Sequence, residues 1–363
     1  MNVFYGSHTA ERKGSAVSLC QLQCSLAGTG FSPVAAFGRE GPMADLTRSR
    51  GIPTVVLKGK GPLGGQLVLD AWRLLGRYEV GLVHLNCAVS FSKYLGIAAR
   101  ARRLPVLWHL REDPADKPLR RLEGWIRRLS DRIVAVSSDI EEVFRDTGKV
   151  VTIYNGVDAE RFRCDGERDA VRRELSIPLG AFVFGMVGSV ERRKGNLNFL
   201  QAAEEAAWHR ADVHLVIVGD GRPEAFQELR GFLADRPSLA SRVVMTGPRA
   251  DVPRLLAALD VLVMPSLWEG FPRALIEAMA AGRPAVATAV GEVPRILEDG
   301  VTGFVVPRDD PGRLAEALAR CLELGPELEE IGRRARARVA SSFTVARHVA
   351  RVTEEYRKVL GWG

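Results

Sequence analysis

The sequence predicts an α/β protein of two doubly wound domains, and three observations lead to this fold class. The chain has 363 residues, more than one domain usually contains. Short apolar runs of strand length alternate with helical patterns in both halves of the chain. A charged stretch near the middle separates the two series. We therefore expect two parallel sheets, each with helices packed on it.

The first half is expected to form six buried parallel strands with helices between them. Apolar residues dominate both faces of each run, which is typical of strands that helices cover on both sides. The six runs are Asn2 to Tyr5, Pro33 to Phe37, Pro53 to Leu57, Val80 to Leu85, Pro105 to His109 and Arg132 to Val136.

The second half repeats this alternation from about Ala181. The charged, weakly periodic stretch from Asn155 to Gly180 is interpreted as a linker, and a long helical pattern from Thr344 to Leu360 ends the series. Two such domains facing each other would leave a cleft at the carboxyl ends of their strands, where open α/β sheets bind ligands. The expected strands are Phe182 to Val187, Val213 to Val218, Arg242 to Thr246, Val261 to Met264, Ala285 to Ala287 and Gly303 to Val306.

Composition and cysteine usage are those of a cytoplasmic globular protein. Hydrophobic residues make up 46% of the chain and the mean hydropathy is -0.02, which excludes a disordered or membrane-embedded protein. The longest uncharged stretch, Gly14 to Gly38, is broken by Gln, Gly and Pro residues, so no transmembrane helix is expected. The five cysteines are scattered without a CxxC pair, and the first residues lack the pattern of a signal peptide. We therefore expect a reduced protein without structural zinc.

The segment from Pro265 to Met279 follows an expected strand and predicts an anion site. Gly270 permits a close backbone approach, and Pro272 suits the first position of a helix. Free N–H groups and the dipole at such a helix terminus would bind a diphosphate. Glu269 and Glu277 would flank this site and bind hydroxyls at both ends of a nucleotide sugar. The alternative is an ordinary acidic helix start with Glu277 facing solvent.

A cluster of three cations, Arg192, Arg193 and Lys194, lies in the loop after the strand that ends at Val187. Fixed positive charges in this place would stabilise a departing diphosphate as negative charge develops on it. A charged surface loop is the alternative interpretation.

Two residues of the first half are further candidates. His109 ends an expected strand and is either a structural or a catalytic histidine. Gly14 follows Lys13 in the loop after the first strand and opens the next helix, where the backbone would approach a phosphate.

The run from Glu269 to Glu277 reads Glu-Gly-Phe-Pro-Arg-Ala-Leu-Ile-Glu, and it resembles the E-x7-E motif of the retaining glycosyltransferases of family 4, which have the GT-B fold. The resemblance extends over almost the whole chain and is strongest from about residue 150 to 320. Segments elsewhere fit the same family, namely Asn155 to Asp158, Lys194-Gly195, Val218 to Gly221 and Glu298 to Gly303.

The resemblance implies two Rossmann-like domains facing a central cleft. The N-terminal, acceptor-side domain would comprise residues 1–165 and be completed by the C-terminal helix, 344–363, while residues 166–343 would bind the nucleotide sugar. It also implies a retaining enzyme that moves a sugar from a nucleotide diphosphate, expected to be UDP, to an acceptor hydroxyl. The acceptor would be a glycan or lipid-linked molecule in lipopolysaccharide, exopolysaccharide or glycolipid assembly. No cofactor is expected, and no DxD-type carboxylate pair is visible, so no metal is expected either.

Family roles carry over by position. Glu269 would hold hydroxyls of the donor sugar and Glu277 those of the ribose, while the amides of Gly270 and Phe271 would meet the diphosphate. Lys194 would stabilise the leaving phosphate. The expected catalytic residues are thus Lys194, Glu269 and His109, and the expected donor-binding residues are Gly14, Arg193, Gly270, Phe271 and Glu277.

The chain departs from the family pattern in the second phosphate cation. The family usually has an arginine five residues before the lysine, where this chain has Ser189. Arg192 or Arg193 would supply that charge from a different place. His109 matches a family histidine near the transferred sugar.

Residues 117–132 predict an amphipathic helix. The helix would either pack by its apolar side with solvated arginines, or present those arginines to an anionic bilayer on the inner face of the plasma membrane. The formal net charge of +7 comes almost entirely from the first 170 residues, which hold 25 basic and 19 acidic side chains. Leu119, Leu122, Trp125, Ile126 and Leu129 fall on one side of the helical wheel, and Arg120, Arg121, Arg127 and Arg128 on the other.

Sequence features of other function classes are weaker. A literal GxGxxG run from Gly59 to Gly64, with Glu79 further on, is typical of dinucleotide-binding oxidoreductases. It follows the third expected strand instead of the first and contains Pro62, which argues against that class. A sugar-nucleotide-binding protein without turnover would share the candidate site, but the presence of both glutamates and Lys194 favours an enzyme. The basic residues are not interleaved with a stacking platform, which argues against nucleic-acid binding.

Overall fold

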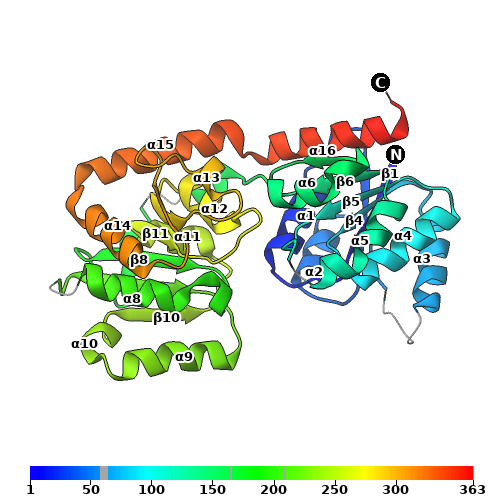
Figure 1. Ribbon diagram of the computed structural model, residues 1–363. Coiled ribbons are helices and arrows are strands. Elements are labelled where there is room, and N and C mark those ends of the chain that lie inside the picture. The colour runs from blue at the N-terminus through cyan, green and yellow to red at the C-terminus, as the bar shows by residue number, and fades with distance from the viewer. Residues whose placement is uncertain (58–63, 116, 164–165, 208–209, 363) are drawn as a thin grey trace. The chain divides into compact units, whose positions relative to one another are not determined.

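The computed structural model describes residues 1–57, 64–115, 117–163, 166–207 and 210–362 (Figure 1). The chain divides into two compact units. Unit 1 consists of Met1–Gly156 together with Val345–Gly363, and unit 2 consists of Val157–Thr344.

The sheet of unit 1 is parallel, with strand order β3-β2-β1-β4-β5-β6-β7. Its strands are β1 (Asn2–Ser7), β2 (Ser32–Phe37), β3 (Thr54–Val56), β4 (Val80–Asn86), β5 (Val106–Leu110), β6 (Arg132–Ala135) and β7 (Val150–Thr152).

Helices connect these strands, and the last helix of the chain packs on the same sheet. Val349, Val352 and Tyr356 of that helix, α16, share a buried cluster with Val3 and Tyr5 of β1. The helices are α1 (Gly14–Cys24), α2 (Pro42–Ser49), α3 (Gly65–Arg77), α4 (Ser90–Ala101), α5 (Lys117–Leu129), α6 (Ser138–Phe144), the short η1 (Arg145–Thr147) and α16 (Val345–Leu360).

Unit 2 contains a second parallel sheet, with strand order β10-β9-β8-β11-β12-β13. Its strands are β8 (Phe182–Val187), β9 (Val213–Val218), β10 (Val243–Gly247), β11 (Val261–Met264), β12 (Ala285–Thr288) and β13 (Phe304–Val306). Its helices are η2 (Ala159–Phe162), α7 (Arg168–Glu174), η3 (Arg192–Lys194), α8 (Asn196–Ala206), α9 (Pro223–Ala234), α10 (Pro237–Ala240), α11 (Val252–Ala258), α12 (Arg273–Ala280), α13 (Val293–Ile296), α14 (Pro311–Glu323) and α15 (Pro326–Ser342).

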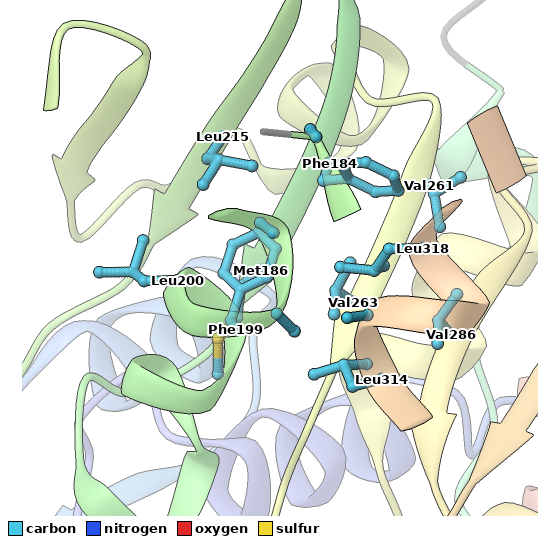
Figure 2. Close-up of a cluster of buried hydrophobic side chains, with 14 of the residues drawn as sticks. Phe184, Met186, Phe199, Leu200, Leu215, Val261, Val263, Val286, Leu314 and Leu318 are labelled. Carbon is cyan, nitrogen blue, oxygen red and sulfur yellow. The ribbon is translucent and has the colours of Figure 1, made fainter. Parts of the chain in front are cut away.

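Apolar side chains from the strands and from α8 and α14 form the core on one face of this sheet. Burying each such side chain contributes about 1.5 to 3 kcal/mol relative to leaving it exposed, so this layer holds the strands and their loops in place. Figure 2 shows Phe184, Met186, Phe199, Leu200, Leu215, Val261, Val263, Val286, Leu314 and Leu318 of this cluster.

The predicted fold class is confirmed. Each of the twelve expected strands is present, with ends within two residues of those expected, and both sheets are parallel. Strand β7 (Val150–Thr152), which lies directly before the expected linker, was not expected.

The interpretation of Asn155 to Gly180 as a linker is wrong. The segment contains η2 and α7, and Val171 of α7 is fully buried. Arg172 is also fully buried, where its guanidinium donates to the carbonyl oxygens of Ala258 and Ala181 and to Asp260. The charged residues of the expected linker therefore include Arg172, which holds α7 against the rest of unit 2.

Candidate active site

In each sheet the order of the strands reverses between two neighbours, β1 and β4 in unit 1 and β8 and β11 in unit 2. Open α/β sheets bind ligands beyond the carboxyl ends of the strands at such a point. In unit 2 the loop after β8 carries Lys194 and the loop after β11 carries Glu269. Topology thus brings together two of the residues that the sequence predicts as catalytic.

Lys194 and Glu269 form a close ion pair. The Nζ of Lys194 donates to Oε1 of Glu269 at 2.6 Å, and the hydroxyl of Ser266 donates to the same oxygen at 2.7 Å. The side chains of Lys194 and Glu269 are 19% and 8% exposed. The pair is therefore mostly shielded from water, and the hydrogen bond from Ser266 helps to hold the carboxylate in place.

Two glycines allow the loops around this pair to touch. A Cβ built on Gly195, whose φ is +71°, would lie 2.1 Å from the carbonyl oxygen of Pro265. A Cβ on Gly291, whose φ is +49°, would lie 1.8 Å from the carbonyl oxygen of Glu269. Side chains do not fit at either position, so backbone contact on both sides sets the place of Glu269.

Helix α12 begins one residue later than expected. Pro272 is the residue before the helix, with an extended ψ of 97°, and is not its first residue. Arg273 opens the helix and donates to Glu277 one turn on, at 2.7 Å. Their side chains are 14% and 16% exposed, so Glu277 does not face open solvent as the alternative interpretation required.

Gly270 and Phe271 lie between β11 and α12, where the sequence analysis placed them. The carbonyl oxygen of Gly270 accepts from the amide of Glu292 at 3.3 Å. The ring of Phe271 is buried and lies 5.9 Å from that of Phe343. Packing of the side chain thus fixes the segment whose amides are the expected phosphate donors.

The cation cluster is held by specific contacts. Arg193 donates to Glu191 at 2.9 Å, and its guanidinium lies 5.5 Å from the centre of the Trp268 ring. Ser189, which stands where the family has an arginine, donates to Glu191 at 2.7 Å. Although partial burial opposes the charged form, the hydrogen bond from Ser189 and the charge of Arg193 lower the pKa of Glu191. Arg192 is exposed, so both arginines stay candidates for the second phosphate cation.

Unit 1 holds the two remaining candidates. His109, the fourth residue of β5, is fully buried. Burial, followed by the charge of Arg111, holds the pKa of His109 well below its ordinary value, so the imidazole is neutral. Gly14 is the exposed first residue of α1, on the loop that follows β1.

The expected division of α5 into an apolar and a basic side is wrong in two places. Trp125 is 41% exposed, whereas Leu119, Leu122, Ile126 and Leu129 are buried as predicted. Arg127 is the other exception, because it pairs with Glu123 and Asp146 and donates to the carbonyl oxygen of Val143.

The GxGxxG run lies outside the described residues except for Gly64, which precedes α3. Among the residues that the structure describes, no group of three or more His, Cys, Asp or Glu side chains is arranged to hold a metal ion. No helix in the described part of the chain is long and apolar enough to cross a membrane.

Sequence reasoning missed Ser266 and Gly291. Ser266 lies inside the motif segment, three residues before Glu269, but a serine after a strand gives no signal of the carboxylate that it will bond. Gly291 precedes a Val-Pro pair in a loop, and its left-handed φ becomes meaningful only when the approach of Glu269 is seen.

Two family models match the chain. Residues 13–161 match the family described as Glycosyltransferase Family 4, and residues 181–324 match the family described as Glycosyl transferases group 1. Together the matched ranges cover most of both units. The chain is thus a glycosyltransferase, similar to Glycosyltransferase Family 4 in its first part and to Glycosyl transferases group 1 in its second.

Characterised proteins that are similar to this glycosyltransferase over most of its length are glycosyltransferases too. It is 28% identical over 307 residues to UDP-Gal:alpha-D-GlcNAc-diphosphoundecaprenol alpha-1,3-galactosyltransferase of Escherichia coli, which covers 80% of this chain and 78% of the relative. It is 28% identical over 311 residues to D-inositol 3-phosphate glycosyltransferase of Mycobacterium tuberculosis, which covers 82% of this chain but only 60% of the relative.

Solved structures show the same GT-B fold. Anabaena HepE in complex with UDP-glucose matches this glycosyltransferase with a TM-score of 0.88 at 24% identity, over 99% of this chain and 100% of that one. WaaG, a glycosyltransferase of lipopolysaccharide biosynthesis, matches with a TM-score of 0.74 at 17% identity, over 97% and 98% of the two chains.

Proposed function

We propose that this protein is a retaining glycosyltransferase that moves a sugar from a UDP-sugar to an acceptor hydroxyl. The observation that carries the proposal is the shielded Lys194–Glu269 pair beside the amino terminus of α12, at the carboxyl ends of the strands where ligands of such sheets bind. The relatives supply the donor class, because the Escherichia coli enzyme is named for UDP-Gal and HepE was solved with UDP-glucose.

The proposed reaction exchanges one bond for another at the anomeric carbon. The bond from this carbon to the diphosphate oxygen breaks, and a bond to the acceptor oxygen forms. The proton of the acceptor hydroxyl passes to the leaving phosphate. Lys194 would stabilise the charge that develops on the diphosphate, since a cation held in place before the reaction needs little reorganisation.

Glu269 has two roles in this proposal. Its Oε1 atom holds Lys194 and accepts from Ser266, which orients the ammonium group before substrate binds. Its remaining acceptor capacity would bind hydroxyls of the donor sugar. Because a carboxylate has about four acceptor positions, both roles are compatible.

The rest of the donor would lie along α12. The amides at the start of this helix, together with those of Gly270 and Phe271, would bind the diphosphate. Glu277, oriented by Arg273, would accept from the ribose hydroxyls. Arg193 or Arg192 would add a second cation, Gly14 would approach the donor phosphate from unit 1, and His109 would act beside the transferred sugar. These groups provide positive charge at the phosphates, so we propose catalysis that is independent of a metal.

The acceptor is proposed to be a glycan or a lipid-linked sugar of a cell-envelope pathway. The Escherichia coli relative acts on a diphosphoundecaprenol-linked sugar and WaaG acts in lipopolysaccharide biosynthesis, as their names state. The enzyme would accordingly work in the cytoplasm at the inner face of the plasma membrane.

The surface of α5 supports membrane association. Lys117, Arg121, Trp125 and Arg128 are exposed and follow one another at helical spacing, so they form one outward stripe. The Nζ of Lys93 on the neighbouring α4 lies 5.5 Å from the centre of the Trp125 ring. A tryptophan among cations is typical of surfaces that contact anionic headgroups, where each cation contributes about 1 kcal/mol.

The proposed activity is tested with purified protein, a panel of nucleotide sugars and EDTA. We expect one UDP-sugar to raise the melting temperature, because ligand at about 100 times its Kd adds about 2.7 kcal/mol of stability. The same UDP-sugar should be hydrolysed or transferred in EDTA. Strict dependence of turnover on Mg²⁺ or Mn²⁺ would contradict metal independence, and binding without turnover would indicate a sugar-nucleotide-binding protein.

Membrane association is tested by co-sedimentation with phosphatidylglycerol vesicles. Binding should weaken with added salt and when Arg120, Arg121 and Arg128 become Gln, and should also weaken in Trp125→Ala. Arg127 is left unchanged because it holds α5 to α6. In the matched control, three exposed arginines of unit 2, Arg163, Arg313 and Arg333, become Gln. This variant should bind the vesicles as the wild type does. Absence of binding at low salt would overturn this part of the proposal.

A further inference from the structure

The face of the first sheet that α16 covers changes from apolar to polar towards the carboxyl ends of its strands. His84 and Asn86 of β4 and His109 of β5 are all fully buried, and Asn86 pairs in register with His109. The ring of His109 lies 5.4 Å from that of His84 and 6.0 Å from that of His348, on α16. Three buried histidine rings thus lie close together, so the protonation state of each affects the others.

Arg111 spans this cluster from the end of β5. Its Nε donates to Oδ1 of Asn86 at 2.8 Å, and its NH1 group donates to Oδ1 of Asn155 at 2.5 Å. Its NH2 group lies 3.4 Å from Nδ1 of His109. The two asparagines hold the guanidinium in place, so its third contact is directed at His109.

This contact defines which nitrogen of His109 carries the proton. A guanidinium has donors and no acceptor, so the Nδ1 atom that faces it must accept. In a neutral imidazole the other nitrogen then carries the hydrogen. The Nε2 atom of His109 is buried and has no hydrogen-bond partner among the described residues. A buried donor without a partner costs about 1 to 3 kcal/mol, so a ligand that accepts a hydrogen bond from Nε2 would remove this cost.

The surrounding groups favour the neutral ring. The charge of Arg111 and the neighbouring His84 and His348 all oppose a second proton on His109, and burial opposes it most. His348 contacts the carbonyl oxygen of Tyr154 through Nδ1 at 2.7 Å, and His84 contacts the hydroxyl of Tyr356 through Nδ1 at 2.6 Å.

Glu112, the acidic residue closest to His109 in the sequence, bonds the backbone and not the imidazole. Glu112 accepts from the amides of Ala88 and Arg111. Its oxygens are thus used by the backbone, and nothing in these contacts stabilises an imidazolium at His109.

We propose that Arg111 is a positioning residue that fixes His109 as a neutral imidazole with its proton on Nε2, so that His109 gives the transferred sugar a hydrogen-bond donor and does not shuttle protons. The part of this inference that concerns the sugar rests on the proposed function. The part that concerns the tautomer does not, because it can be measured without turnover.

The test is a long-range ¹H–¹⁵N correlation spectrum of the full chain labelled with ¹⁵N-histidine. The chain has six histidines, and His109→Gln assigns the signal of His109. We expect a wild-type spectrum with the hydrogen on Nε2 that does not change between about pH 6 and 8, where an ordinary histidine titrates. Once the signal is assigned, a hydrogen on Nδ1, or titration in this range, in the wild type would overturn the proposal whether or not the Arg111 variants fold.

Variants of Arg111 then test the role of the guanidinium. Arg111→Met should give a mixture of both tautomers, whereas Arg111→Lys, which keeps a charged donor, should restore much of the wild-type signal. Arg48→Met, which removes an exposed arginine of the same unit, is the control and should leave the signal unchanged. A wild-type tautomer in folded Arg111→Met would show that Arg111 does not fix it.

Activity provides the second readout. Arg111→Met should lower kcat by about 10- to 100-fold, the usual effect of losing a group that orients another, with a smaller change in KM. His109→Gln, whose amide nitrogen can lie near the place of Nε2, should keep more activity than His109→Asn. If Arg111→Met changes the tautomer of His109 as expected but leaves kcat unchanged, then Arg111 positions the ring, and the role of His109 at the sugar is refuted.

Discussion

Replacing Gly291 by alanine is expected to damage the active site, although Gly291 itself is not proposed to contact substrate. Gly291 has a φ of +49°, and the Cβ of an alanine would lie 1.8 Å from the carbonyl oxygen of Glu269. Ordinary contact begins at 3.4 Å, so the two segments must separate by about 1.6 Å. Glu269 holds Lys194, and the displacement therefore reaches the ion pair.

Two separate effects contribute to the expected result. The left-handed backbone conformation costs about 1 to 2 kcal/mol for a residue with a Cβ. The displacement adds to this cost, and a misplacement of about 1 Å in a reacting group lowers the rate by about 100-fold. We therefore expect Gly291→Ala to lose stability and to lose about two orders of magnitude in kcat.

Gly300→Ala is the matched control for the backbone effect. Gly300 also has a left-handed φ, of +70°, but no atom lies within 4 Å of its added Cβ. Urea unfolding and initial rates with a UDP-sugar should show a similar backbone cost in both variants, and a loss of kcat in Gly291→Ala alone. Equal activity of the two variants would refute the reasoning that contact at Gly291 positions Glu269.

Three further substitutions test individual side chains. Lys194→Ala should lower kcat by about 10²- to 10³-fold in steady-state assays, because it removes the preorganised charge beside the leaving group, and an unchanged kcat would remove Lys194 from the mechanism. Glu277→Ala should mainly raise the Kd for UDP in calorimetric titrations, since its proposed contact with ribose changes little during the reaction, and an unchanged Kd would reject that contact. Asp251→Asn should make the free energy of unfolding less dependent on pH in acid. Hydrogen bonds from Arg249 lower the pKa of Asp251 to about 2. The contribution of the ionised Asp251 to stability is therefore complete above the unfolded pKa of about 3.9 and is lost as pH falls towards 2. The check is the urea midpoint between about pH 5 and 3, where a variant as acid-sensitive as the wild type would contradict this role for Asp251.

The sequence was sufficient to predict the sheets, because buried parallel strands are apolar on both faces and their runs stand out. It also placed Lys194 and Glu269 after two expected strands. That these strands are neighbours follows from the strand order β8-β11, which no local pattern contains. The contact between the two loops is therefore a result of the structure.

The wrong predictions for residues 155–180 and for α5 have a common physical cause. The charge or apolarity of a side chain does not by itself determine whether that side chain is exposed. Arg172 is fully buried because backbone carbonyls and Asp260 take up its donors. Trp125 is exposed although the helical wheel placed it with the leucines, because the buried side of α5 is complete without it. The role of Arg111 likewise depends on asparagines that are 25 residues before and 44 residues after it in the chain.

The configuration of the first-formed product tests the central claim most directly. The protein is incubated with an α-linked UDP-sugar that it binds, and the anomeric proton of the released or transferred sugar is followed by ¹H NMR before mutarotation. A retaining transferase at the Lys194–Glu269 site predicts that the α product forms first and that Lys194→Ala suppresses its formation. Initial formation of the β product would contradict the proposed mechanism, and undiminished α product from Lys194→Ala would contradict the proposed site.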